Sequence, residues 1–411
     1  MINILKAVYS VMLRILLFPM RIFPVHPRRI IFTALTGGNT YEYSCNLKYI
    51  CEYLLDNLPG EFEILWVVAQ PRKYEKEKKR GIRFLQHYRL RSFYYLLTAK
   101  VVVTSGAYAP WFPFRKNQYV INTWHGGGAY KRLRDDLPGA GWLERRRTKF
   151  CAENIDLFLS SCRMATEKLF RGAFHYCGEI MEAGMPRNDC LVNGQTEAGR
   201  KKVQSYFKIP EGDRIVLYAP TYRSPQKTVT LDGGRLLKLL EESENSSISC
   251  GKGGEERRGR WHLLFRAHRY QEGMEGIRVE GDYQDAGDYP DMQELLCAAD
   301  MLITDYSSVV WDYSFLFRPC FLYVPDLQEY TEKTGFYVDI HDWPFPTAGS
   351  WEELKKEIEE YDAKKAKEQI REHHRRMGSL ESGHACERAA ERIAAVCAQK
   401  DCHKTCPVSD R

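Results

Sequence analysis

Residues 300–319 carry side chains whose types and order could do chemistry. The apolar run Met301–Ile303 predicts a buried strand. It ends in the polar turn Thr304-Asp305-Tyr306-Ser307-Ser308, and an apolar run with helical spacing follows. A strand that enters a helix through small hydroxyl residues is typical of an anion site, because free backbone N–H groups and the helix dipole point at one place. In the alternative interpretation, Ser307 or Ser308 only caps the helix.

A histidine followed by glycines forms a second cluster. His125 comes just after the apolar run 120–122 and precedes Gly126, Gly127 and Gly128. A histidine at a strand end, beside glycines that let a substrate approach the backbone, is well placed to act as a general base. A lone histidine is more often structural, and the glycines lack the spacing of a dinucleotide-binding loop. Both interpretations of His125 therefore stay open at this point.

Cationic side chains follow two further predicted strands. Arg223 comes after the run 214–218, and Arg266 and His268 come after the run 263–265. Each could be an ordinary surface charge, although the planar fork of an arginine also suits a phosphate group. Their recurrence at successive strand ends, together with the two serines, favours a convergent site for a polyanion.

Strand-like and helical patterns alternate along the chain, which predicts parallel sheets with helices on both faces. The predicted strands are 30–32, 64–68, 101–103, 120–122, 157–159, 214–218, 263–265, 301–303 and 321–323. The predicted helices are 43–58, 92–98, 291–298, a long charged helix 351–377, and 387–396. A polar boundary near 191–212 divides two α/β halves, and we expect a cleft between them with ligands at the carboxyl ends of the strands. Residues 243–260 are expected to form a surface loop.

Composition narrows the class of protein. The 411 residues are 44% hydrophobic and 28% charged, which indicates an ordinary globular chain of about two domains. The net charge of +6 suits phosphate-bearing partners and does not predict nucleic-acid binding. The thirteen cysteines are scattered, which favours reduced thiols in a cytosolic protein.

The N-terminus carries a membrane signal. Residues 2–18 are mostly apolar, their polar positions fall on one helical stripe, and basic residues follow. The run is too short and too interrupted to predict a transmembrane span, so a basic amphipathic helix on an anionic membrane surface fits best. The alternative is a helix that packs on the protein's own core.

The order and spacing of these motifs resemble those of the CDP-glycerol glycerophosphotransferase family, which includes teichoic-acid glycerol-phosphate primases and polymerases. The resemblance covers roughly residues 28 to 397. The motifs that carry it are His125-Gly126, Gly184–Asp189, Ala219–Arg223, Arg266–His268, Thr304–Ser308, Gly335–Tyr337 and Gly383 with Glu387-Arg388.

The resemblance implies two Rossmann-like domains of the GT-B type that face a cleft. It divides the chain into a membrane-associating segment 1–27, an acceptor domain 28–195, a CDP-polyol donor domain 196–397 and a disordered tail 398–411. The implied reaction transfers glycerol phosphate from CDP-glycerol to a hydroxyl of a lipid-linked acceptor at the cytoplasmic face of the membrane, and CMP leaves.

Site residues follow from the same resemblance. His125 is the expected general base, and His268 is expected to take part in catalysis beside the diphosphate. Asp305 is expected to orient the hydroxyl turn. The further substrate-binding residues are Gly126, Gly127, Arg187, Asn188, Thr221, Arg223, Arg266, Ser307 and Ser308. Phosphoryl transfer depends mostly on positioning and charge neutralisation, which cationic side chains can supply, so we expect no essential metal and no cofactor.

Three positions depart from the family pattern. Gly127-Gly128 stands where Thr-Pro is usual, Ser224 replaces an acid, and Arg269 replaces a proline. The polyol and the acceptor therefore stay open, and CDP-ribitol is a second candidate donor. Two different functions also stay open, a GT-B glycosyltransferase that uses a nucleotide sugar and a non-catalytic membrane scaffold.

Overall fold

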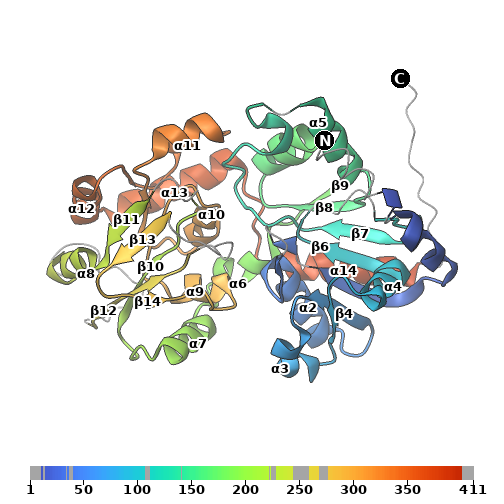
Figure 1. Cartoon of the computed structure of the whole chain (residues 1–411). Helices are drawn as coiled ribbons and strands as arrows, with labels where there is room; N and C mark the ends of the chain where they lie inside the picture. The colour runs from blue at the N-terminus through green and yellow to red at the C-terminus, as the bar shows by residue number, and fades with distance from the viewer. Residues whose placement is uncertain are drawn as a thin grey trace.

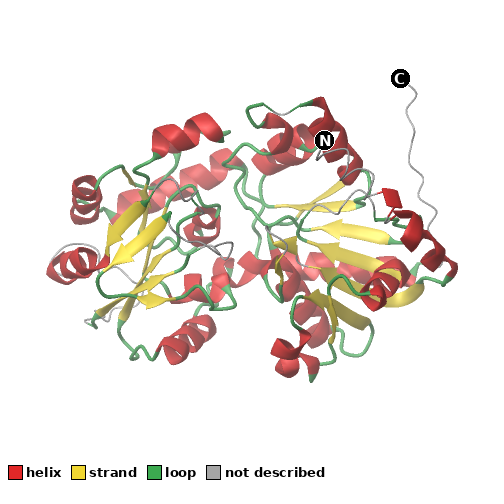
Figure 2. Ribbon diagram, in the orientation of Figure 1, coloured by secondary structure: helices red, strands yellow, loops and turns green. Residues whose placement is uncertain are grey.

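Figure 1 shows two lobes, and Figure 2 shows that each is built around its own sheet with helices packed about it. The structure is a computed structural model that describes residues 11–12, 14–33, 35–36, 40–106, 112–139, 141–221, 223, 228–243, 259–267 and 276–399. The predicted α/β class with two parallel sheets is confirmed.

The first sheet has seven parallel strands in the described residues, in the order β5-β4-β1-β6-β7-β8-β9. In that order they are Arg83–Gln86, Glu63–Val68, His26–Thr33, Ala99–Thr104, Tyr119–Asn122, Leu157–Ser160 and Glu179–Glu182. A short antiparallel pair, β2 (Leu35–Thr36) and β3 (Thr40–Tyr41), lies apart from this sheet. The chain runs outward from β1 and then returns to β6, so the strand order reverses between these two strands. Open α/β sheets bind ligands outside the carboxyl ends of the strands at such a reversal.

The second sheet has six parallel strands in the described part of the chain, in the order β14-β12-β10-β15-β16-β17. In that order they are Gln284–Asp285, Trp261–Phe265, Arg214–Tyr218, Met301–Thr304, Cys320–Tyr323 and Thr347–Ala348. Strands β11 (Val229–Asp232) and β13 (Ile277–Glu280) form a separate parallel pair. Here the order reverses between β10 and β15, the two strands that precede the motifs at 219–223 and 304–308.

Helices cover both sheets (Figure 1). Their bounds are α2 (Cys45–Asn57), α3 (Glu75–Lys78), α4 (Leu90–Thr98), α5 (Trp142–Ala152), α6 (Asp189–Val192), α7 (Glu197–Phe207), α8 (Gly233–Glu242), α9 (Met292–Ala298), α10 (Val309–Ser314), α11 (Leu327–Lys333), α12 (Trp351–Glu359), α13 (Ala363–Met377) and α14 (Ala385–Ala398). Short 3-10 turns lie at Phe18–Ile22, Pro71–Tyr74, Arg134–Asp136, Pro186–Asn188 and Ile340–Asp342, and a π-helical stretch spans Ala165–Ala173.

The prediction of one long helix over 351–377 was wrong. The structure has two helices, α12 and α13, with a break at residues 360–362. The Asp362 carboxylate accepts hydrogen bonds from the backbone N–H groups of Lys364 (2.9 Å) and Lys365 (3.0 Å). This N-cap starts a new helix, so the charged pattern on either side belongs to two segments.

Helix α14 returns to the first lobe (Figure 1). Its buried residues Ala389, Ala390 and Ile393 share a core with residues of β1 and β6. The predicted donor domain 196–397 therefore contains a final helix that packs on the other sheet. Residues 244–258 of the predicted loop 243–260 and residues 400–411 of the predicted tail 398–411 lie outside the described residues. Ala398, the first residue of the predicted tail, is the last residue of α14.

The described part of the N-terminal segment leaves its apolar side chains at the surface. Residues 14–17 are helical and Leu17 is buried. The exposed apolar side chains in its described residues are Val11, Met12, Ile15, Leu16, Phe18, Ile22 and Phe23. In the described residues no helix has the length and apolar character that crossing a bilayer requires.

The two lobes share a buried apolar junction. The Tyr130 ring, from the loop after β7, lies 4.2 Å from the ring of Trp343 in the second lobe, centroid to centroid. Its hydroxyl is hydrogen-bonded to His373 Nε2 on α13 at 2.9 Å. One continuous cluster of buried residues includes members of both lobes. This junction brings the loop after His125 against the second lobe.

Candidate active site

The loop after β7 holds His125 through its neighbours. The Asn122 side chain accepts a hydrogen bond from Trp124 N at 2.8 Å, and the Asn46 amide donates to Trp124 O at 3.0 Å. Trp124 has a φ of +54°, a left-handed conformation that non-glycine residues adopt rarely. The next residue, His125, is thereby turned towards the end of β6, beside the reversal of strand order in the first sheet.

His125 has the protonation expected of a general base. Its Nδ1 lies 2.9 Å from the carbonyl oxygen of Ser105. A carbonyl can only accept, so Nδ1 carries the proton and the neutral ring leaves Nε2 as an acceptor. Desolvation lowers the pKa of His125 to about 4, and the positive charges of Arg187 and Lys131 act in the same direction. The ring is therefore neutral near pH 7.

Gly126 brings the two predicted clusters together. A Cβ at Gly126 would lie 3.5 Å from Ser308 Oγ, which belongs to the second lobe. A Cβ at Gly127 would lie only 2.2 Å from Cδ1 of Trp311 on α10, so this position has room for glycine alone. The glycines allow the His125 loop to approach the start of α10 closely.

The hydroxyl turn is fixed by Asp305. The Asp305 carboxylate accepts hydrogen bonds from Thr221 N (3.0 Å to Oδ1 and 2.9 Å to Oδ2) and from Thr221 Oγ1 (2.9 Å). Thr221 and Asp305 follow β10 and β15, so their contact lies at the reversal of strand order in the second sheet. These bonds tie the turn that carries Ser307 and Ser308 to the segment after β10, and the role of Asp305 in orienting the turn stays a prediction.

The two serines differ in their contacts. Ser307 Oγ accepts a long hydrogen bond of 3.4 Å from Val309 N. Ser308 is the N-cap residue of α10, yet its side chain makes no capping hydrogen bond. Ser307 therefore caps the helix only through one long hydrogen bond, and the Ser308 hydroxyl does not cap it. Helix α10 spans only six residues, so its dipole adds little to the site.

Arg223 is held by carboxylates of its own lobe. Its Nη2 lies 2.8 Å from Asp305 Oδ2, and its Nε lies 2.6 Å from Asp326 Oδ2. The guanidinium also lies over the ring of Tyr306, 4.9 Å from the centroid. In this state its described contacts support the hydroxyl turn.

Arg187 and Asn188 join the lobes through Asp312 on α10. Arg187 Nη2 lies 2.8 Å from Asp312 Oδ2, and Asn188 Nδ2 donates to Asp312 Oδ1 at 3.0 Å. Arg187 Nη1 also donates to the carbonyl oxygen of His125 at 2.7 Å. Asp189, the last residue of this motif, accepts hydrogen bonds from Ala385 N (3.0 Å) and Cys386 N (2.7 Å). Its carboxylate therefore satisfies two backbone N–H groups in the first turn of α14.

The Arg266 guanidinium is directed to the side of the second sheet. Its Nη1 donates to the carbonyl oxygens of Ala286 (3.0 Å) and Tyr289 (2.7 Å). Burial lowers the pKa of Arg266. His268 lies outside the described residues, so its predicted role stays a prediction.

Four groups near the site were missed in the sequence. Asp326, Asp312 and Glu381 provide the carboxyl groups that hold Arg223, Arg187 and Asn188. Lys131 lies six residues after His125, in the loop that crosses to the second lobe. Asp326 follows β16 as Asp305 follows β15, a position that could have marked it. Asp312 and Glu381 carry no comparable signal.

The structure thus brings together His125, Gly126, Gly127, Thr221, Asp305, Ser307 and Ser308, with Arg187, Asn188 and Arg223 packed around them. Among the described residues no group of three histidine, cysteine or acidic side chains is arranged to hold a metal ion. The arrangement places a neutral imidazole, hydroxyl groups and nearby cations where the two lobes meet.

A profile of the CDP-Glycerol:Poly(glycerophosphate) glycerophosphotransferase family matches residues 15–395. The chain belongs to this glycerophosphotransferase family. It is a transferase, one of the enzymes that use CDP-glycerol to make the teichoic acid of the cell wall.

Relatives of the family extend the match. The chain is 28% identical over 403 residues to the teichoic acid poly(glycerol phosphate) polymerase of Bacillus spizizenii, covering 95% of this chain and 97% of that one. It is 30% identical over 354 residues to the polymerase of the same name from Bacillus subtilis, where it covers 82% of this chain and 44% of the relative. A solved structure of the wall teichoic acid polymerase TagF superposes with a TM-score of 0.73 and 26% identity, over 91% of this chain and 90% of that one. TagF has also been solved after a soak with CDPG.

Proposed function

We propose that this enzyme transfers glycerol phosphate from CDP-glycerol to a hydroxyl of a membrane-associated, lipid-linked acceptor, with release of CMP. In the proposed reaction the acceptor oxygen attacks the β-phosphorus, and His125 Nε2 takes the hydroxyl proton. The bond from the β-phosphorus to the bridging oxygen breaks, and its electron pair leaves with CMP. A new phosphodiester joins glycerol to the acceptor.

The approach of Gly126 to Ser308 carries this proposal. It joins a strand-end histidine of the first sheet to a strand-end hydroxyl of the second, beside the reversals of strand order. Phosphoryl transfer needs an oriented nucleophile and donors for the phosphate oxygens more than covalent help. His125 and the Ser307-Ser308 turn supply one requirement each.

The identity of the polyol is part of the proposal. CDP-ribitol is the alternative donor, because relatives also include the teichoic acid poly(ribitol-phosphate) polymerase of Bacillus spizizenii, 23% identical over 355 residues. The glycerol-phosphate relatives match at higher identity, 28% over 403 residues in the same organism. This difference favours glycerol.

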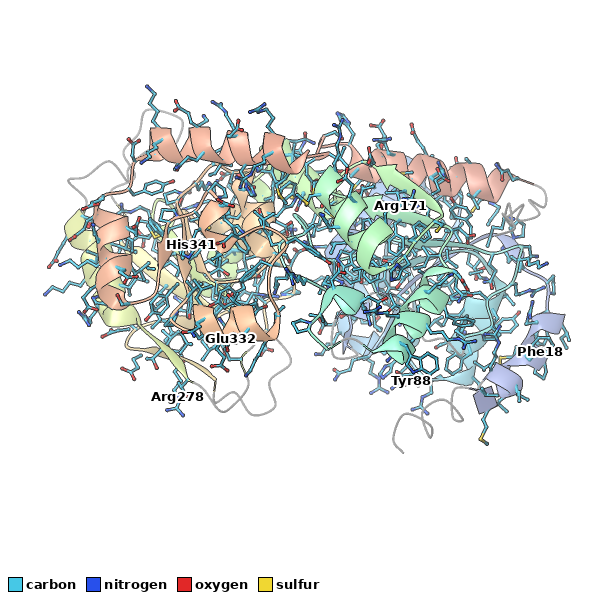
Figure 3. The ribbon with its side chains drawn as sticks, turned by 90° about the horizontal axis from the view of Figure 1, so that it is seen from above. Phe18, Tyr88, Arg171, Arg278, Glu332 and His341 are labelled. Carbon is cyan, nitrogen blue, oxygen red and sulfur yellow. The ribbon has the colours of Figure 1, made fainter. Side chains whose placement is uncertain are left out.

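A peripheral position on the membrane supports access to a lipid-linked acceptor. The exposed apolar residues between Val11 and Ile22 lie beside α5, since the Arg14 guanidinium is 6.0 Å from the Phe150 ring centroid. Trp142 at the start of α5 is 67% exposed. Figure 3 shows Phe18 on the same lobe as Tyr88, another exposed aromatic residue. Apolar side chains interspersed with arginine suit an anionic lipid surface.

The test is acceptor-dependent release of labelled CMP. Purified enzyme is given CDP-glycerol, CDP-ribitol, a UDP-sugar or a GDP-sugar, with a lipid-linked saccharide acceptor in detergent. We expect turnover with CDP-glycerol that persists in EDTA. Turnover with nucleotide sugars alone would replace the proposal with a glycosyltransferase. Activity that is lost in EDTA and restored by Mg²⁺ would overturn the expectation that the enzyme needs no metal ion.

A further inference from the structure

Lys131 is held at the joint of the two lobes by backbone pairing. Tyr337 N donates to Tyr130 O at 2.9 Å, and Arg132 N donates to Gly335 O at 3.2 Å. Between these bonds Lys131 pairs with Phe336 in an antiparallel bridge. The Gly-Phe-Tyr motif of the second lobe therefore fixes the backbone of the loop that begins at His125.

The Lys131 side chain runs towards the hydroxyl turn. Its ammonium lies 5.8 Å from the ring centroid of Tyr330. Tyr330 stacks on Tyr306 of the turn, with centroids 3.9 Å apart. The ammonium thus lies beside a ring that stacks on the turn proposed to bind phosphate, and its backbone belongs to the loop that begins at the proposed base.

Nearby arginines already have protein partners. Arg223 is paired with Asp305 and Asp326, and Arg187 is paired with Asp312. The Lys131 side chain, by contrast, makes no hydrogen bond or ion pair within the residues that the structure describes. Desolvation lowers its pKa to about 8, against the opposing effect of Asp305. A desolvated ammonium without a carboxylate partner is costly for the protein alone and is relieved when a ligand brings negative charge.

We propose that the Lys131 ammonium binds the phosphoryl group that is transferred, between His125 and the hydroxyl turn. This inference rests on the proposed function and adds a substrate-binding residue to it. As the acceptor oxygen bonds to the β-phosphorus and the bridging oxygen leaves with CMP, negative charge spreads over the oxygens of that group. A lysine contributes there as a compact point charge, and no proton leaves it in the step.

The test compares Lys131→Met with Lys333→Met. Lys333 on α11 is exposed and pairs with Glu329, so its replacement also removes one positive charge from the protein but lies outside the proposed site. Calorimetry measures binding of CDP-glycerol and of CMP, and a turnover assay measures kcat and KM. Lys131→Met removes the charge and keeps an unbranched apolar side chain of similar length, and a thermal melt checks that the variant stays folded.

We expect Lys131→Met to lower kcat/KM roughly 10²–10³-fold, as loss of a transition-state charge partner does. It should weaken CDP-glycerol binding by at least about tenfold and CMP binding by less than about threefold, because CMP lacks the transferred group. Lys131→Arg should restore part of the activity, and Lys333→Met should match the wild type.

Equal losses for CMP and CDP-glycerol, or values within about threefold of wild type for both, would overturn the role of Lys131. The binding arm does not depend on turnover, so it separates this inference from the proposed reaction. If wild type binds CDP-glycerol through Lys131 and transfers nothing, the proposed function fails, while binding of the β-phosphoryl group by Lys131 stands.

Discussion

Gly126 and Ser308 face each other across the joint of the lobes, so close that a methyl group on Gly126 would stand 3.5 Å from the Ser308 hydroxyl. One residue belongs to the loop after β7 and the other to the turn after β15. Each loop lies near the reversal of strand order in its sheet, where open α/β sheets bind ligands. A single contact therefore connects the two places that the fold favours for substrate.

Two neighbouring glycines should respond differently to alanine. Gly126→Ala has room in the protein but puts a methyl group against Ser308, so we expect normal folding and weaker CDP-glycerol binding. Gly127→Ala would collide with Trp311 and should cost roughly 1–3 kcal/mol of stability, as overpacking does. Urea unfolding and calorimetry on both variants measure this. Equal stability of the two variants would contradict the packing of Trp311.

Removing the imidazole tests the base. His125→Ala should lower kcat roughly 10²–10⁴-fold and leave CDP-glycerol affinity largely unchanged. His125→Asn is the matched control, because its amide can still donate to Ser105 O and yet cannot take a proton at neutral pH. We expect it to be as slow as His125→Ala. Wild-type polymer production in cells that carry either variant would favour the non-catalytic alternative.

The pH profile should have two limbs. His125 has a pKa of about 4 and acts as a base when unprotonated, so kcat/KM should fall as pH drops towards that value. Lys131 has a pKa of about 8 and acts when protonated, so kcat/KM should also fall above pH 8. Burial also raises the pKa of Glu381 to about 8. The alkaline limb should persist in Glu381→Gln and move upward in Lys131→Arg; the reverse pattern would assign it to Glu381.

The Arg187–Asp312 pair should contribute mainly to stability. Breaking a buried ion pair by Arg187→Met or Asp312→Leu alone should cost roughly 3–5 kcal/mol, because one charge is left buried. The double variant should recover part of that cost. The exposed pair Lys333–Glu329 is the control, with a coupling energy below about 1 kcal/mol. Additive losses at Arg187 and Asp312 in urea unfolding would refute the coupling.

Membrane binding should depend on the exposed face of the N-terminal segment. Replacing Ile15, Leu16 and Ile22 by serine should release the protein from anionic vesicles in a flotation assay, with little change in its melting temperature. Tyr206 and Tyr283, which are exposed on the second lobe, provide the control replacements. If the serine variant still binds vesicles and the control variant does not, the membrane-binding surface lies on the second lobe instead.

Central strands were predictable and edge strands were not. Strand β10 was predicted with its observed bounds, because RIVLY is an apolar run buried between neighbours. Strands β5 (RFLQ) and β9 (EIME) were missed, and they form the two edges of the first sheet. An edge strand is half exposed and its sequence carries charges, so its apolar signal is weak.

The site was predictable in its motifs and not in its ion pairs. The spacing of His125 and Ser308 from their strands was enough to predict that both lie at strand ends. The partners of Arg223 and Arg187 are Asp326 and Asp312, which lie far away in the sequence. Only the packing of the two lobes decides which arginines already have a carboxylate partner. Among the described residues, it leaves Lys131 with no carboxylate within ion-pairing distance.

The most direct measurement is a crystal structure of His125→Asn soaked with CDP-glycerol. The account predicts the diphosphate between Gly126 and Ser308, with the β-phosphoryl group within hydrogen-bonding distance of the Ser308 hydroxyl and in contact with the Lys131 ammonium. A nucleotide bound on either lobe with its phosphates away from this joint would contradict the account.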